Sequence, residues 1–206
     1  NNDPFQGGQH LQDVFLFSPI FFQGTLVGFG ATVAHHLDLG GGAPGLNPDA
    51  TDVHQEGLIF SHNKLYDGGK INTELHRLIL KNVRQPVAVE GDLNAKIAAC
   101  HTGARRYQEL CDRYGADTVE ASLCETLDQS EVRMREEIRS FPNGTYQAEA
   151  YLDNDGVRLD HPCKIAVTVT VDDDVMKIDW SGSDPVAVGP VNHPFIGTKA
   201  MCGTVM

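Results

Sequence analysis

Residues 10–38 read HLQDVFLFSPIFFQGTLVGFGATVAHHLD, and this stretch decides how the N-terminal part of the chain folds. Two apolar runs rich in aromatic and β-branched residues, 14–22 and 26–34, flank Gln23-Gly24, a pattern typical of a β-hairpin. The His and Asp residues of the stretch stand only at its two outer ends. Because paired strands lie about 4.8 Å apart, we expect these polar ends to meet in space.

The side chains at these ends are suitable ligands for a divalent cation such as zinc, manganese or iron. The register of the hairpin decides which histidine joins Asp13: a two-residue loop places His36 on the face of Asp13, and a three-residue loop places His35 directly opposite it. His35 follows alternating apolar residues, which indicates that its face is the buried one. We therefore favour His10, Asp13 and His35 as metal ligands and His36 as a supporting or substrate-contacting group.

Two further carboxylates lie in or near the long irregular segment 40–69, which is rich in Gly, Pro, Asn and Asp and is of the kind that often carries function. Glu56 is a candidate general base or further ligand, with a solvated loop carboxylate as the alternative. Asp38 either completes the ligand shell or caps the Gly-rich turn that follows it. The candidate catalytic residues are thus Glu56 and His36.

The middle of the chain predicts helices. A short helix is expected near 73–82. A longer one follows, with Asp92 as its N-cap and Gly115 just past its end. Its apolar stripe recurs at alternating steps of four and three residues: Leu93, Ile97, Cys100, Ala104, Tyr107, Cys111 and Tyr114. A third helix is expected over 117–140, and we predict that it forms an antiparallel pair with the second.

Beyond Pro142 the apolar period changes to two, which predicts antiparallel strands. Strands, then helices, then strands indicate an α+β fold. We predict that residues 1–206 form part of one domain, with a hairpin and site loops over 1–70, a helical part over 71–141 and a β-rich part over 142–206. Because the chain lacks an initiator Met and ends in small apolar residues, we expect it to be a piece of a longer chain.

Charge and composition exclude some classes of function. With 16 basic and 28 acidic residues, the chain carries a formal net charge of −12, which disfavours binding to nucleic acid or to anionic membrane surfaces. The sequence contains no apolar run long enough for a membrane span and no secretory signal pattern. We therefore expect a cytoplasmic protein without nucleic-acid or membrane partners.

A series of motifs resembles the hydantoinase B/oxoprolinase family over nearly the whole chain. In order, these are NDPF-x-GG-x-H-x-x-D, AHH-x-D-x-GG-x-x-PG, ATD-x-x-QEG, GDL-x-A-x-x-AA, GARR, PNGTY, DWSGS and GPVN. The resemblance implies a subunit of an enzyme that opens cyclic amides with ATP or, in a related branch, carboxylates ketones with ATP. In the carboxylase branch the corresponding motif positions hold a divalent metal, which by resemblance implies His10, Asp13 and His35 here.

The leading interpretation is the B-type subunit of an ATP-dependent amidohydrolase that opens a hydantoin, 5-oxoproline or a similar lactam. The sequence contains no G-x-x-x-x-G-K-[ST] loop, and the resemblance implies that ATP is bound by an A-type partner subunit, so no residue of this chain is assigned to ATP. One alternative is the matching subunit of an ATP-dependent ketone carboxylase of the acetone or acetophenone type. Another is a non-catalytic assembly subunit whose histidine cluster is only structural.

Overall fold

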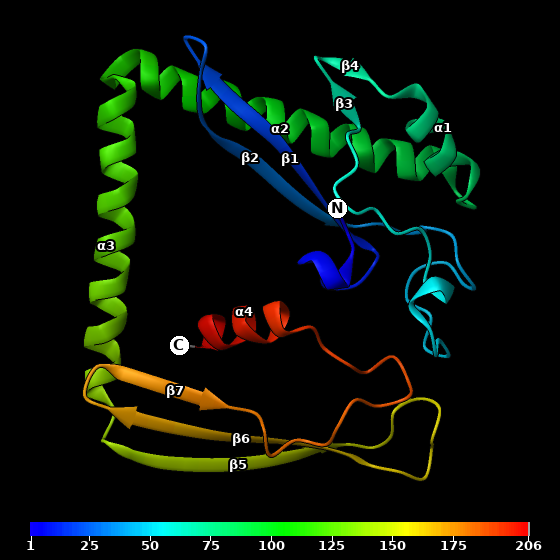
Figure 1. Cartoon of the computed structure of the whole chain (residues 1–206), viewed down its shortest axis with the longest axis vertical. Coiled ribbons are helices and arrows are strands. Elements are labelled where there is room, and N and C mark those ends of the chain that lie inside the picture. Colours follow the sequence, from blue (N-terminus) through cyan, green and yellow to red (C-terminus); the bar gives the residue numbers. More distant parts are fainter. Residues whose placement is uncertain (206) are drawn as a thin grey trace. The chain divides into compact units, whose positions relative to one another are not determined.

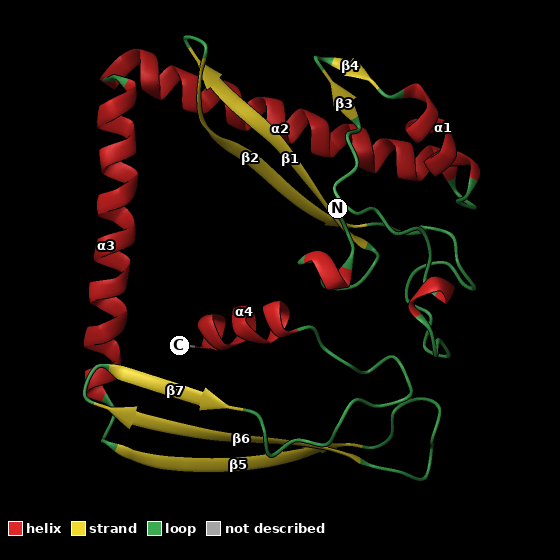
Figure 2. Cartoon of the chain, in the orientation of Figure 1, coloured by secondary structure: helices red, strands yellow, loops and turns green. Residues whose placement is uncertain are grey.

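The computed structural model describes residues 1–205; Met206, the last residue of the predicted β-rich part, lies outside the described residues. Helices and small antiparallel sheets alternate along the chain, as the α+β prediction expects (Figures 1 and 2). The elements are η1 (Pro4–Gln6), β1 (Asp13–Phe22), β2 (Thr25–His35), η2 (Val53–Gln55), β3 (Tyr66–Asp67), β4 (Lys70–Ile71), α1 (Thr73–Lys81), α2 (Pro86–Tyr114), α3 (Ala116–Ser140), β5 (Gly144–Leu152), β6 (Cys163–Asp172), β7 (Val175–Asp179) and α4 (Phe195–Val205).

The described residues form two compact units. The first contains residues 1–116 and 193–205, and therefore the hairpin, α1, α2 and α4. The second contains residues 117–192, with α3 after its first residue and the sheet β5-β6-β7. The sequence analysis did not predict α4, which lies within the part expected to be β-rich.

The hairpin β1-β2 combines both of the predicted alternatives. Its loop has two residues, Gln23 and Gly24, both with positive φ (51° and 84°), as a tight hairpin turn requires. A β-bulge then shifts the register, since Phe21 pairs with Leu26 while Ile20 pairs with Gly28. The extra residue, Val27, moves all later pairs by one position. Asp13 therefore lies opposite His35 although the loop has only two residues.

Helix α2 runs along the hairpin, which it contacts through both strands (Figure 1). A Cβ atom added at Gly30 would lie 3.4 Å from the Cys100 carbonyl oxygen, so the glycine permits this close approach. The helix covers the face of β2 that carries Gly30 and Thr32, whose hydroxyl lies 3.7 Å from Cys100 Sγ. The expectation that the face of His35 is buried is wrong, because Phe29 and Val33 on that face are exposed.

Helix α2 also begins earlier than predicted. Pro86 occupies its first turn, where a missing N–H costs no hydrogen bond, and the helix then continues through Asp92. The prediction that Asp92 is the N-cap is therefore wrong. Its end is as predicted, with Gly115 as the C-cap. Because α2 and α3 belong to different units, their antiparallel pairing stays a prediction.

The core of the first unit fixes the loop after the hairpin. Val14, Leu39, Phe60, Ile79 and Leu93 are among the buried residues of this apolar cluster. The buried Asp38 carboxylate accepts hydrogen bonds from the Gly40 N–H (2.9 Å) and from the Arg84 side chain (3.0 Å) and backbone. Burial raises the pKa of Asp38, but these hydrogen bonds and the Arg84 charge outweigh it and hold that pKa below its usual value.

The second unit is a long helix and a three-stranded antiparallel sheet in the order β5-β6-β7, where the alternating pattern predicts strands. Asp173 and Asp174 form the turn between β6 and β7. Arg139 on α3 donates to the Asp174 carboxylate at 2.7 Å, and Arg135 lies 3.4 Å from the same side chain. Among the described residues, no helix combines the length and the apolar character that a membrane crossing would need.

Candidate metal centre

The candidate site forms where the hairpin ends. Before β1 the chain makes a turn in which the Asp13 N–H donates to the His10 carbonyl at 3.0 Å, and this turn brings the His10 and Asp13 side chains together. His35 is the last residue of β2 and pairs with Asp13. The polar ends of the two strands therefore meet, as the sequence predicts.

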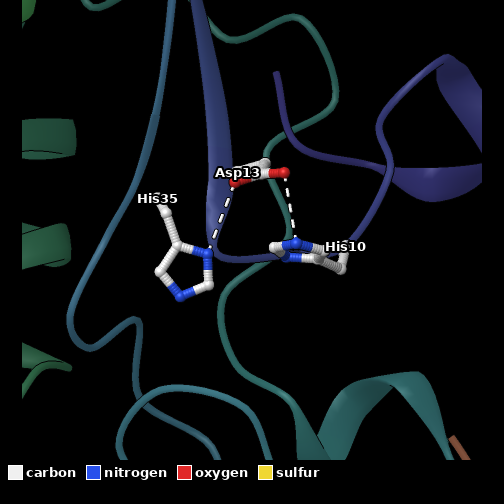
Figure 3. Close-up of side chains that lie close together, drawn as sticks. All are labelled: His10, Asp13 and His35. Atoms are coloured by element: carbon white, nitrogen blue, oxygen red, sulfur yellow. Dashed lines mark ion pairs between the residues drawn. The ribbon is translucent and has the colours of Figure 1, made fainter. Parts of the chain in front are cut away.

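The Asp13 carboxylate bridges the two imidazole rings, with one ion pair to each (Figure 3). Its Oδ2 is 3.1 Å from His10 Nε2, and its Oδ1 is 3.4 Å from His35 Nδ1. The two rings meet edge to face, with centroids 5.1 Å apart. One ligand atom from each of the three residues lies within 4.8 Å of the other two.

These spacings fit a divalent cation. Metal–ligand bonds of about 2.0–2.1 Å in a tetrahedral arrangement place neighbouring ligand atoms about 3.3 Å apart. The observed separations of 3.1 and 3.4 Å are close to this value, and the second is longer than a direct N–H···O hydrogen bond. Two imidazoles and one carboxylate leave coordination positions for substrate or water.

The backbone around the ligands is held by a buried asparagine that the sequence analysis missed. The Asn2 side chain is fully buried; it donates to the carbonyls of Leu11 (2.6 Å) and Leu58 (2.9 Å) and accepts from the Phe60 N–H (2.6 Å). It thus joins the turn that carries His10 to the loop that carries Glu56. The NDPF stretch contained this residue, but no periodicity distinguishes a buried asparagine from an exposed one.

Three buried side-chain atoms lack a hydrogen-bond partner among the described residues: His10 Nδ1, Gln12 Oε1 and His36 Nδ1. The amide nitrogen of Gln12, Nε2, donates to the backbone carbonyls of Gly45 (2.7 Å) and Glu56 (3.3 Å). It therefore links the turn before β1 to the long loop that follows the hairpin. Buried polar atoms are nearly always satisfied, and exceptions often mark places where water or a ligand binds. The His10 atom that faces Asp13 is Nε2, so His10 Nδ1 and Gln12 Oε1 lie beside the group of three ligand atoms and are not part of it.

Glu56 lies near the site without joining the group of three. It is half-buried just after η2, and burial raises the pKa of its carboxyl while the charge of His10 lowers it. Its surroundings are therefore not those of a fully solvated loop carboxylate.

Asp38 points away from the three ligands and contacts Gly40 and Arg84. Of its two predicted roles, the structure therefore supports the cap of the Gly-rich turn.

His36 faces away from the ligands, toward α2. Its side chain is fully buried, and its Nε2 lies 2.9 Å from the ammonium of Lys96, while its Nδ1 lies 3.9 Å from an oxygen of Asp92. Burial, and then the Lys96 charge, lower the pKa of His36 to about 4. The imidazole is therefore neutral near pH 7. The sequence analysis missed Lys96, although its position between Leu93 and Cys100 places it on the apolar stripe.

The whole chain, residues 1–206, matches the protein family described as hydantoinase B/oxoprolinase. The chain belongs to this family. It is 41% identical to a protein of Pseudomonas sp. (strain NS671) that is provisionally named as the B-type subunit of a D-/L-hydantoinase, over 96% of this chain and 34% of that protein. The recognition made from the motifs is therefore confirmed.

Two further comparisons place this hydantoinase B-family chain among its relatives. The crystal structure of an ATP-dependent caprolactamase from Pseudomonas jessenii superposes with a TM-score of 0.88 at 33% identity, over 100% of this chain and 35% of that one. The acetophenone carboxylase delta subunit of Aromatoleum aromaticum (strain DSM 19018 / LMG 30748 / EbN1) is 28% identical over 94% of this chain and 29% of that protein. The chain thus spans about a third of the length of these relatives.

Proposed function

We propose that this chain belongs to the B-type subunit of an ATP-dependent amidohydrolase that opens a hydantoin, 5-oxoproline or a similar lactam at a divalent metal held by His10, Asp13 and His35. The observation that carries the proposal is the convergence of these three side chains at the end of the hairpin. The relatives named as a hydantoinase subunit and an ATP-dependent caprolactamase support the substrate class.

ATP has a clear chemical purpose in such a reaction. Resonance makes an amide carbonyl a poor electrophile, and phosphorylation of its oxygen removes that protection. We assign this step to an A-type partner subunit that holds ATP. The overall reaction consumes ATP and water and releases ADP, phosphate and the ring-opened product.

The residues of this chain have separate parts in the proposal. His10, Asp13 and His35 hold the cation, and zinc, manganese and iron all suit this ligand set. A bound divalent cation supplies Lewis acidity and lowers the pKa of water. Glu56 is the general base that takes a proton from the attacking water, and its raised pKa brings it closer to the neutral range in which a base works well. The cytoplasmic location stays a prediction.

The acetophenone carboxylase relative favours a second candidate, an ATP-dependent ketone carboxylase that uses the same cation. ATP consumption by the complete protein with its partner subunit, measured against hydantoins, 5-oxoproline, caprolactam and ketones, distinguishes the two. The proposal expects turnover with a cyclic amide and without bicarbonate. Turnover only with a ketone and bicarbonate would contradict it. A metal-free His10→Ala variant with full activity would instead support a purely structural histidine cluster.

The bulge offers a separate test of the ligand geometry. Val27 has no partner in β1, so its deletion should close the bulge and leave the pairs from Ile20–Gly28 to Asp13–His35 unchanged. We expect the deletion variant of the complete protein to bind cobalt(II) with unchanged stoichiometry in a spectroscopic titration. Val27→Ala, which keeps the bulge, is the control. A folded deletion variant that binds no cobalt would show that the bulge itself aims the ligands.

A further inference from the structure

A buried lysine from α2 reaches the hairpin just behind the ligands. The Lys96 ammonium donates to the Val14 carbonyl oxygen at 2.8 Å and lies 2.9 Å from His36 Nε2. Only 4% of Lys96 is exposed. An ammonium group can only donate, so in these two contacts the Val14 carbonyl oxygen and His36 Nε2 are the acceptors.

The two acceptors have a particular place in the chain. Val14 directly follows Asp13, and His36 directly follows His35. Successive side chains of a strand point to opposite faces, so Asp13 and His35 share the face away from α2, and the His36 ring lies toward α2, where Lys96 contacts it together with the Val14 backbone carbonyl. One ammonium therefore binds the residue next to each of the two strand-borne ligands.

The ladder between the strands ends at this point. Asp13 and His35 form the last pair of β1 and β2. Beyond that pair, the His36 N–H donates to the Gln12 carbonyl at 2.8 Å. The Lys96 contact with the His36 ring is thus a second anchor, besides this backbone hydrogen bond, for the chain just after β2 has ended.

Lys96 stabilises the fold less than an apolar side chain would at the same position of α2. It occupies the apolar stripe of α2 between Leu93 and Cys100, where an apolar side chain would be buried without loss of solvation. Burial lowers the pKa of Lys96 to about 8, although Asp92 acts in the opposite direction. A buried charged group is a poor means of stabilising a core, so a positional role explains this lysine better than a stabilising one.

We propose that Lys96 is a positioning residue of the metal centre, which holds the backbone beside Asp13 and His35 so that both side chains converge on one cation. This inference rests on the proposed metal-dependent function. Lys96 has two opposing effects on metal binding. Its ammonium repels a nearby divalent cation, so loss of the charge alone would strengthen metal binding. Loss of its hydrogen bonds to Val14 and His36 would weaken metal binding.

The test is a cobalt(II) titration of the complete protein carrying Lys96→Met, which keeps the length and apolar stem of the side chain without its charge. We expect the dissociation constant for cobalt to rise by roughly 10–100-fold, the effect typical of groups that orient metal ligands, and the visible absorption of the bound cobalt to change. Val89→Ala is the matched control, because Val89 is a fully buried residue of the same helix. It should lower the stability to unfolding and leave cobalt affinity and spectrum unchanged.

Unchanged or tighter cobalt binding by Lys96→Met, with an unchanged spectrum, would overturn the inference. Should that variant not fold, Lys96→Gln, a polar side chain one bond too short to reach both acceptors, gives the reading: weaker binding with an altered spectrum supports the role of Lys96, and wild-type binding refutes it. A wild-type protein that binds no divalent metal would overturn the metal centre itself. That outcome is distinct from a positioning failure, in which the wild type binds cobalt and the variants bind it equally well.

Discussion

Replacement of His35 by alanine is expected to remove the bound divalent metal from the complete protein and to abolish its ATP-dependent turnover of a cyclic amide. His35 supplies one of only two imidazoles in the group, and its Nδ1 lies 3.4 Å from Asp13. A cation left with two protein ligands from one short turn binds weakly. Because metal catalysis contributes several kcal/mol, we expect turnover to fall by about 10³-fold or more.

Metal analysis and turnover should be measured on the same preparation of the His35→Ala variant. His161→Ala is the matched control, because His161 is an exposed histidine of the second unit. The control should keep both metal and activity. Near-stoichiometric metal in a folded, active His35→Ala protein would exclude His35 as a ligand.

The second large effect is expected at Glu56. Glu56→Gln keeps the shape of the side chain but removes its ability to take a proton. We expect turnover to fall by about 10²–10⁴-fold, the usual contribution of a general base, while the bound metal stays unchanged. The half-buried position of Glu56 near His10, outside the group of three ligands, is the basis for this separation of effects.

The same two measurements, metal content and turnover, decide between the two predicted roles of Glu56. A Glu56→Gln protein that loses its metal would identify Glu56 as a further ligand. A Glu56→Gln protein that keeps both its metal and full turnover would show that Glu56 is an ordinary loop carboxylate. Glu120→Gln, at an exposed position of α3, controls for the loss of one negative charge and should have no effect.

The sequence alone predicted the convergence of ligands because a hairpin must bring its ends together. It could not predict the register, since the bulge at Val27 is a property of backbone pairing and leaves no periodic signal. The choice of His35 was therefore right for the geometry but rested partly on a wrong reason. The apolar residues before His35 lie on the exposed face, and Gly30 lies on the face that α2 covers.

The helix α2 illustrates a second limit of local patterns. Its apolar stripe and its final glycine were readable, because both follow from helix geometry. Its start was not, because Asp92 resembles an N-cap while Pro86 is an equally good first residue. The same stripe contained Lys96, whose burial depends on two acceptors that are 82 and 60 residues away in the chain. Such contacts become visible only when the fold is known.

The central claim is that one divalent cation binds His10, Asp13 and His35 together. The most direct test is anomalous X-ray diffraction from crystals of the complete protein, recorded at the absorption edge of the metal that purifies with it. We expect a single anomalous peak at the end of the hairpin, within bonding distance of His10 Nε2, His35 Nδ1 and an oxygen of Asp13. A metal peak elsewhere, with these three side chains bonded only to one another, would contradict the claim.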